Sequence, residues 1–203
     1  MKKDIIELFI LNYSSLDLEM VNNYLSSDEI NYFNNYLDKE VKKEKIASLL
    51  LKKKYIGSYS KDKNNKPISS AFKFNISHSY GYIVLARNKE YNIGVDIELI
   101  REYKKELINR FFSLEECNYI EDNKSFYEIW TSKESIAKAY GKGINLNMKN
   151  IPGLPINGVK DFNNIKWYSK TLMYQNYIIS ITINSKNDFD FIINELKIED
   201  ILS

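Results

Sequence analysis

The chain has 203 residues, enough to bury a hydrophobic core as one large domain or as two small ones that share an interface. Its 29 basic and 27 acidic side chains leave a net charge of +2, so no overall field draws the protein to nucleic acid or an anionic membrane. The apolar run at residues 5–11 is too short for a signal peptide, and no later run approaches a membrane span. With a single cysteine, Cys117, the composition fits a reducing compartment, and we expect a cytoplasmic protein.

The first half of the chain alternates strand-like and helical patterns. Ser26 is followed three residues later by Glu29, which is the spacing of a capping box at the start of a helix. The next helical stretch has one apolar side and many lysines elsewhere, as is typical of a solvated helix face. The predicted elements are a strand at 4–11, helices at 26–36 and 38–55, a polar loop at 57–71, an extended piece at 72–79 and a strand at 82–86.

The second half begins with another strand, at residues 92–100. The turn at 88–92 predicts that this strand pairs with the strand at 82–86 as a hairpin. Ser113 and Glu116 repeat the capping-box spacing. The remaining predicted elements are a helix ending near 107–112, helices from 113 and at 126–140, a winding connector at 152–158, strands at 166–172, 177–183 and 189–195, and a closing turn at 198–202.

Two carboxylates lie one residue apart on the strand at 92–100. Because strand side chains alternate, Asp96 and Glu98 point to one face while the apolar residues between them point to the other. Two buried carboxylates repel, so one would take up a proton unless a cation lies between them. A hard divalent ion is the expected guest.

The helix at 126–140 carries a second set of polar side chains. Trp130, Glu134 and Lys138 follow each other at i, i+4 and i+8 and therefore share one face. Lys133 flanks them, and Lys142 lies beyond the helix. If this helix crosses the acidic face of the strand, Glu134 becomes a third oxygen ligand among lysines. Such a site suits Mg²⁺, which prefers a few carboxylates, retained waters and substrate phosphate oxygens.

Each of these features has a plainer interpretation when taken alone. An Asp-x-Glu pattern is more often a solvated strand edge than a ligand pair, and a Glu–Lys step of four is usually surface support. A lone histidine such as His78 is more often structural than a ligand. Their combination in one chain is what favours a metal-bound pyrophosphate.

Three sequence blocks resemble those of a known family. The block GVDIE, followed by WTSKES-x-x-K-x-x-GKGI, resembles the paired signature of the 4′-phosphopantetheinyl transferases of the larger, surfactin-synthetase-activating (Sfp-like) type, and FNISHS at 74–79 resembles an upstream block of that family. The resemblance covers residues 66–144. It implies an α+β, pseudo-twofold fold of two similar α/β halves, residues 1–100 and 101–203, with the active site in the cleft between them.

The reaction implied by the resemblance moves the 4′-phosphopantetheine arm of coenzyme A to a serine hydroxyl of an apo carrier protein and releases adenosine 3′,5′-bisphosphate. It implies that Mg²⁺ is held by Asp96, Glu98 and Glu134, and that Lys138 stabilises charge on the leaving phosphate. Glu134 is also the candidate base for the serine, and the residues leave open whether it is ligand, base or both.

The resemblance also implies a binding site for coenzyme A. The family places an arginine on the second helix for the 3′-phosphate, but the matching stretch at 42–45 has none, so Lys43 or Lys45 would serve as a point charge. The Lys-Pro pair lies against the adenine end, and the histidine block along the phosphates. The implied coenzyme A-binding residues are Lys43, Lys66, Pro67, Ser77, His78, Lys133 and Lys138.

The partner implied is an apo acyl or peptidyl carrier protein. Because carrier domains are acidic as a class, the basic and apolar group Arg110, Phe111 and Phe112 is a candidate docking site, although the two phenylalanines read equally as core. By family analogy a chain of this length is a monomer. The sequence leaves open which carrier it serves and whether acylated coenzyme A is accepted.

Two rival functions fit parts of the pattern. Another Mg²⁺-dependent phosphodiester-cleaving enzyme would also use an Asp-x-Glu pair with a distal glutamate and lysine. A nonenzymatic nucleic-acid binder would use the lysine-rich helix at 38–55, but the charge is nearly balanced and aromatic residues do not interleave with the lysines. We therefore expect neither a nucleic-acid nor a membrane partner.

Overall fold

The computed structural model describes residues 3–63, 66–141 and 147–202. The mixed α+β class expected from the sequence is confirmed. The elements up to residue 88 are β1 (Asp4–Asn12), α1 (Leu18–Val21), the 3-10 turn η1 (Asn22–Tyr24), α2 (Ser27–Asn34), α3 (Lys39–Tyr55), β2 (Ser60–Lys61), β3 (Pro67–Ile68), β4 (Lys73–Ser79) and β5 (Tyr82–Asn88). Those that follow are β6 (Ile93–Leu99), α4 (Glu106–Phe111), α5 (Leu114–Tyr119), α6 (Asn123–Tyr140), η2 (Met148–Asn150), β7 (Gly158–Phe162), β8 (Ile165–Tyr174), β9 (Tyr177–Ile183), β10 (Phe189–Leu196) and η3 (Ile198–Ile201).

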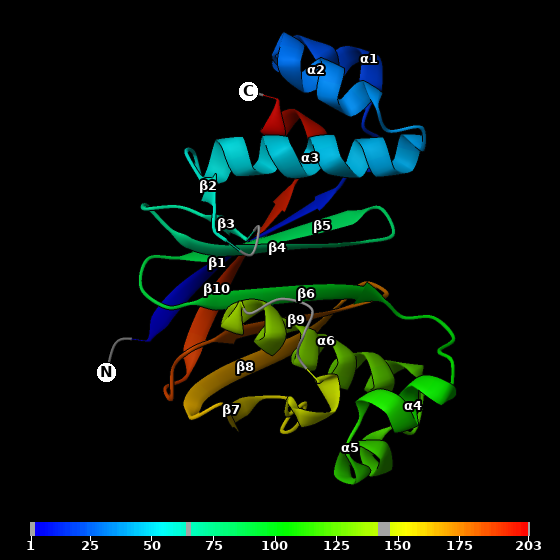
Figure 1. Cartoon of the computed structure of the whole chain (residues 1–203), viewed down its shortest axis with the longest axis vertical. Coiled ribbons are helices and arrows are strands. Elements are labelled where there is room, and N and C mark those ends of the chain that lie inside the picture. Colours follow the sequence, from blue (N-terminus) through cyan, green and yellow to red (C-terminus); the bar gives the residue numbers. More distant parts are fainter. Residues whose placement is uncertain (1–2, 64–65, 142–146, 203) are drawn as a thin grey trace.

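Two four-stranded sheets form the centre of the molecule (Figure 1). The first has the order β10-β1-β5-β4 and the second the order β6-β9-β8-β7. In each, the strand that comes first in sequence pairs antiparallel with the last strand of a hairpin, and the other hairpin strand lies outside. β10 adds to the first sheet in parallel with β1. Three strands of each sheet, β1-β5-β4 and β6-β9-β8, therefore share one order, whereas the fourth strand, β10 or β7, lies at opposite ends of the two sets.

Alternation along the strands divides the core into layers. On β5, Ile83 and Leu85 pack against α3, whereas Val84 and Ala86 enter a cluster shared with the second sheet. The same inter-sheet cluster holds Val95 of β6 and further apolar residues of β9. α3 therefore covers the outer face of the first sheet, and α6 packs against β6 and β9 on the outer face of the second.

Two sequence expectations need correction. The strands at 82–86 and 92–100 do not form a hairpin, because β5 pairs with β1 and β4 while β6 pairs with β9. The connector at 152–158 leads directly into a strand, β7, that was not expected. The sheets themselves do not divide at residue 100, since β6 precedes it but belongs to the second sheet and β10 follows it but belongs to the first, and the two halves at 1–100 and 101–203 stay a prediction. Local turn signals do not specify which distant edge a strand joins.

The described residues contain no helix with the length and apolar character needed to cross a membrane.

Candidate active site

Helix α6 lies across the polar face of β6, as the alternation of Asp96 and Glu98 predicts. It starts at a capping box between Asp122 and Ser125 and ends at Gly141, whose φ of 74° few residues other than glycine adopt. Gly94 on β6 allows this approach, because a Cβ there would collide with the backbone of Ser135 on the helix.

Buried hydroxyl pairs hold the other side of the same helix to β9. Thr131 Oγ1 lies 2.7 Å from Ser180 Oγ, and Ser135 Oγ lies 2.6 Å from Thr182 Oγ1. All four side chains are fully buried, and each hydroxyl has a partner, so the contact carries no unpaired polar group. The position of α6 on the sheet is therefore set by directed bonds as well as by packing.

Asp96 is the centre of the polar cluster that results. Its side chain is buried, and its Oδ1 accepts hydrogen bonds from Lys138 Nζ at 2.6 Å and from Ser77 Oγ at 2.9 Å. Lys138 Nζ also donates to Ser77 Oγ at 2.8 Å. Asp96 Oδ2 is buried and has no hydrogen-bond partner among the residues that the structure describes. β4, β6 and α6 thus each contribute one side chain to a single contact.

The other two acidic side chains of the cluster, Glu98 and Glu134, are partly buried and feel the charge of Asp96. Burial and, after it, the charge of Asp96 together raise the pKa of Glu134 to about 6 against the opposing charge of Lys138. Burial and the charge of Asp96 likewise raise the pKa of Glu98, whose Oε2 accepts a hydrogen bond from Ser79 Oγ at 2.9 Å. Added positive charge at this place would therefore stabilise the ionised form of both carboxyl groups.

The oxygen atoms of these residues are of the type that a hard cation binds, but the side chains are not gathered into a complete set of metal ligands. In the described ranges, no group of three or more His, Cys, Asp or Glu side chains is drawn together closely enough to hold a metal ion. The unpaired, buried Asp96 Oδ2 and the raised pKa of both glutamates nevertheless favour an oxygen-seeking divalent ion. The donor set thus fits Mg²⁺ in type.

The edge strands β4 and β6 are joined by side chains instead of by a backbone ladder. Val95 N donates to Asn75 Oδ1 at 3.1 Å, and Leu99 N donates to Ser79 Oγ at 3.2 Å. With Ser77 between them, every second residue of β4 faces β6. Neither Asn75 nor Ser79 was expected from the sequence to belong to the site. Both lie two positions from Ser77, so the alternation of a strand could have placed them on the same face.

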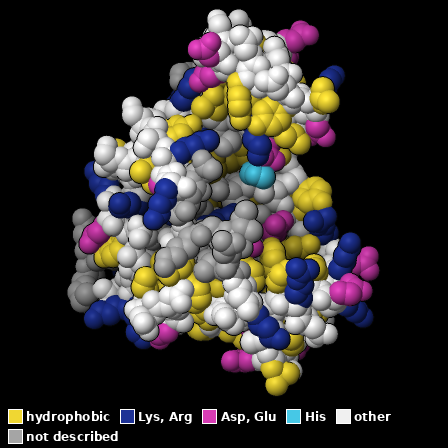
Figure 2. Space-filling view, in the orientation of Figure 1, with side chains coloured by type: hydrophobic (Ala, Val, Ile, Leu, Met, Phe, Trp, Pro, Cys, Tyr) yellow, Lys and Arg dark blue, Asp and Glu magenta, His cyan; other side chains and the backbone are white. Residues whose placement is uncertain are grey.

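His78 lies on the opposite face of β4 from Ser77. Its Nδ1 is 3.0 Å from Glu44 Oε2 on α3, and nearly half of its side chain is exposed. Glu44 also accepts a hydrogen bond from Lys45 at 2.6 Å. Burial pushes the pKa of Glu44 up, but these two partners outweigh it and lower the pKa overall. In Figure 2 the single histidine, in cyan, lies in the hollow between the upper and lower parts of the molecule.

The lysines expected at the 3′-phosphate have protein partners. Lys43 Nζ donates to the backbone carbonyl of Ser14 at 2.9 Å and lies 3.2 Å from Glu40 Oε1. Lys45 is bonded to Glu44, beside the histidine. Both remain partly exposed on the α3 side of the hollow, so neither lysine is favoured over the other as the phosphate contact.

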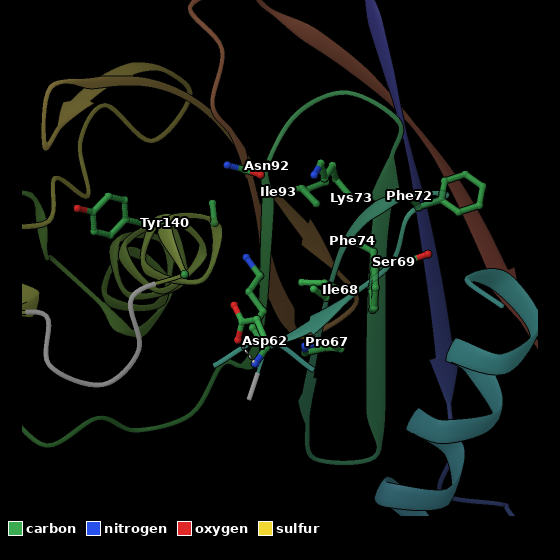
Figure 3. Close-up of a pocket in the computed structure, with 13 residues that line it drawn as sticks. Asp62, Pro67, Ile68, Ser69, Phe72, Lys73, Phe74, Asn92, Ile93 and Tyr140 are labelled. Atoms are coloured by element: carbon green, nitrogen blue, oxygen red, sulfur yellow. Dashed lines mark hydrogen bonds between the residues drawn. The ribbon is translucent and has the colours of Figure 1, made fainter. Parts of the chain in front are cut away.

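Lys66 and Pro67 line a cavity of about 220 Å³ at the C-terminal end of α6 (Figure 3). Lys66 Nζ donates to the carbonyl of Lys138 at 2.9 Å, so it meets the negative end of the helix dipole. Burial lowers the pKa of Lys66. Ile68 and Phe74 add apolar surface to this wall. The glycine-lysine block after Gly141 falls on residues 142–146, outside the described residues.

Lys133 does not reach this site, which corrects the expectation that it contacts phosphates. Its side chain is fully buried, with Nζ 2.7 and 2.6 Å from the two carboxylate oxygens of Glu116 on α5. Lys138 is five positions further along the helix, which corresponds to about 140° around the axis. The two lysines therefore point to different sides of α6.

The expected docking group is only partly on the surface. Phe112 is buried against Phe126 and Trp130 and is core, so it is not available for docking. Phe111 is half-buried with its ring edge-on to Trp130, and the exposed Arg110 guanidinium lies over the Phe111 ring. Arg110 and one face of Phe111 are what remains of the predicted surface.

The fold and the site together place three carboxyl groups and a lysine at one seam of an α+β scaffold. A sequence model of the 4′-phosphopantetheinyl transferase superfamily matches residues 92–182. That segment includes β6 and α6, and with them Asp96, Glu98, Glu134 and Lys138.

Individual transferases are similar over parts of the chain. Sfp of Bacillus subtilis is 38% identical over 79 residues, 36% of this chain and 35% of Sfp. The 4′-phosphopantetheinyl transferase gsp of Aneurinibacillus migulanus is 36% identical over 93 residues, 42% of this chain and 39% of gsp. HetI of a Nostoc species is 29% identical over 144 residues, 59% of this chain and 61% of HetI.

The chain thus spans between about a third and three fifths of the length of these relatives. Residues 92–182 match the model of the 4′-phosphopantetheinyl transferase superfamily, and the resemblance of the chain to Sfp-like members is confirmed.

Lys160 of β7 supplies a test of the packing beneath α6. It is buried and donates to Ser132 Oγ. Burial lowers its pKa to about 7, with Glu116 opposing and Lys133 reinforcing the shift. The unfolded chain therefore binds more protons between pH 7 and about 10, so this residue makes stability rise with pH in that window.

We expect Lys160→Met to be stabilised relative to wild type at pH 7 and to lose a large part of that advantage by pH 9, because the difference in bound protons persists up to about pH 10. Urea unfolding at both pH values measures the difference, with Lys166→Met, an exposed lysine paired with Asp161, as the control. A gap between Lys160→Met and wild type that is the same at both pH values contradicts the assigned titration.

Proposed function

We propose that this chain is an enzyme, a 4′-phosphopantetheinyl transferase (holo-carrier-protein synthase) that moves the phosphopantetheine arm of coenzyme A to a serine of an apo carrier protein. The observation that carries the proposal is the contact of Ser77, Asp96 and Lys138, from three separate elements, beside the carboxyl groups of Glu98 and Glu134. The order that three strands of each sheet share, β1-β5-β4 and β6-β9-β8, supports a pseudo-twofold arrangement with the site at the junction of the sheets.

Mg²⁺ would be held by Asp96, Glu98 and Glu134. When bound, it supplies positive charge that neutralises the pyrophosphate of coenzyme A and eases attack on phosphorus. The raised pKa of both glutamates and the unpaired oxygen of Asp96 support this assignment. Release of the ion is expected to leave the three carboxylates repelling one another, with Lys138 as their nearest countercharge.

The chain's own side chains account for the remaining steps. The serine oxygen attacks the β-phosphorus, the bond from that phosphorus to the bridging oxygen breaks, and adenosine 3′,5′-bisphosphate leaves. Glu134 accepts the serine proton, directly or through water. Lys138 stabilises the negative charge on the departing phosphate.

Coenzyme A would lie along the junction between the two sheets. His78 would donate to a phosphate oxygen, and Ser77 would lie along the same phosphates on the other face of β4. Lys66 and Pro67 line the adenine end, where the cavity at α6 lies. Lys43 remains a candidate for the 3′-phosphate. All of these residues come from one chain, which supports a monomer. The acidic carrier protein would approach Arg110 and Phe111.

The decisive experiment incubates the protein with Mg²⁺, coenzyme A and an apo carrier protein, and then weighs the carrier. We expect a mass gain equal to one phosphopantetheine arm, dependent on Mg²⁺ and abolished by a chelator. A panel of acyl and peptidyl carriers identifies the partner. Cleavage of phosphodiesters without any mass gain on the carriers would instead assign the site to a phosphodiesterase.

We expect Glu134→Gln to abolish transfer while the variant remains at least as stable as wild type. A carboxyl whose pKa is raised in the folded state loses its contribution to stability as pH rises through about 6, and a neutral glutamine does not. Glu128→Gln on the same helix is the matched control, because Glu128 pairs only with Lys124 and Tyr119 in the described structure. Wild-type turnover in Glu134→Gln would remove Glu134 from the reaction.

We expect His78→Ala to raise the KM for coenzyme A several-fold and to leave kcat nearly unchanged, because a ground-state phosphate contact is lost. Glu44→Gln is the companion variant, since it removes the carboxylate beside His78 Nδ1 but keeps the imidazole. If the KM for coenzyme A of His78→Ala equals that of wild type, His78 does not contact coenzyme A, and its role is the pairing with Glu44 of α3.

A further inference from the structure

The residue that adjoins Glu134 in the sequence is anchored on the other side of α6. Lys133 Nζ has three acceptors: the two carboxylate oxygens of Glu116 and the carbonyl of Ile151, the last at 2.6 Å. An ammonium group has three protons, so its hydrogen-bonding capacity is filled. The side chain is completely buried, which leaves no coordination for a phosphate.

Glu116 is fixed as firmly as the lysine that it pairs with. Besides Lys133, its carboxylate accepts hydrogen bonds from Gly153 N at 2.6 Å and from Ser113 N at 2.8 Å, the second of which closes the capping box of α5. One buried carboxylate thus joins α5, α6 and the segment at residues 151–153. Gly153 has no room for a side chain, because a Cβ there would meet Ile129 and Glu116.

This anchor determines the rotation of α6 about its own axis. Lys133 and Glu134 are successive residues, so their side chains leave the helix about 100° apart, and fixing one direction fixes the other. A rotation of only about 10° displaces a group near the helix surface by about 1 Å. Displacements of that size are enough to slow a reaction that depends on the placement of a catalytic group.

We propose that the buried Glu116–Lys133 ion pair is a positioning pair, which holds Glu134 towards Asp96 and Glu98 by fixing the rotation of α6. The pair touches neither coenzyme A nor the reacting phosphorus. Its catalytic consequence rests on the proposed function, whereas its effect on the helix does not. Lys133 is thereby assigned a role that its place in the signature, beside Glu134, did not indicate.

The test must separate positioning from stability. Breaking a buried pair by removing one partner is strongly destabilising, whereas replacing both partners with groups of similar volume is often neutral. The double variant Lys133→Met with Glu116→Gln keeps the volume and an acceptor for Gly153 N but has no ion pair. Lys124→Met, an exposed lysine on the same helix that pairs only with Glu128 in the described structure, is the matched control.

We expect the double variant to keep a Tm near that of wild type, to lose about tenfold or more in kcat, and to keep its KM for coenzyme A within about twofold. Lys133→Met alone is expected to lose both stability and kcat. Lys124→Met is expected to match wild type in all three measurements. A double variant that regains stability and kcat together would overturn the inference, because the pair would then contribute stability alone.

A second readout needs no catalytic activity. Hydrogen exchange followed by mass spectrometry should show faster exchange of the amides at 131–139 in the double variant than in wild type or Lys124→Met. If wild type transfers nothing to any carrier, the proposed function fails, and this exchange result alone decides the positioning inference. Unchanged protection of α6 in the double variant would overturn it.

Discussion

Burial of the Asp96 carboxylate is the constraint on which the rest of the structure depends. A buried charge is tolerated only where it is paired and hydrogen-bonded, and here the partners come from outside its own strand. Ser77 of β4 and Lys138 of α6 both donate to one oxygen, so the three elements must meet at this point. The other oxygen lacks a described partner, and so the same constraint that joins the elements also leaves a group able to bind a cation.

Helix α6 lies between two charged clusters, one with excess negative charge and one in which the charges are paired. Towards β6, Glu134 and Glu98 are destabilised as carboxylates by burial and by Asp96. Towards α5, burial lowers the pKa of Lys133, and Glu116 opposes that shift. The first cluster is short of positive charge and is suited to a ligand, whereas the second is saturated by protein groups and is suited to hold the helix. A single helix can serve both because Lys133 leaves it in a different direction from Glu134 and Lys138, which share one face.

The two sheets supply the seam at which this arrangement is built. β4 and β6 are edge strands, and side chains of Asn75 and Ser79 satisfy backbone N–H groups of β6 that a neighbouring strand would otherwise satisfy. Such bonds hold the strands apart by the length of a side chain. β4 and β6 therefore do not merge the two sheets into one continuous sheet. The apolar residues of both sheets form a common core.

Local patterns in the sequence were sufficient for the capping boxes of α2 and α5, for the helix that carries Glu134 and Lys138, and for the alternation that turns Asp96 and Glu98 to one face. These features depend on residues within a few positions of one another. The partners of β5 and β6, the return of β10 to the first sheet and the burial of Lys133 against Glu116 depend on segments far apart in the chain. Only the tertiary structure decided them, because a lysine next to a glutamate has the same local pattern whether its ammonium group meets a ligand or a buried carboxylate.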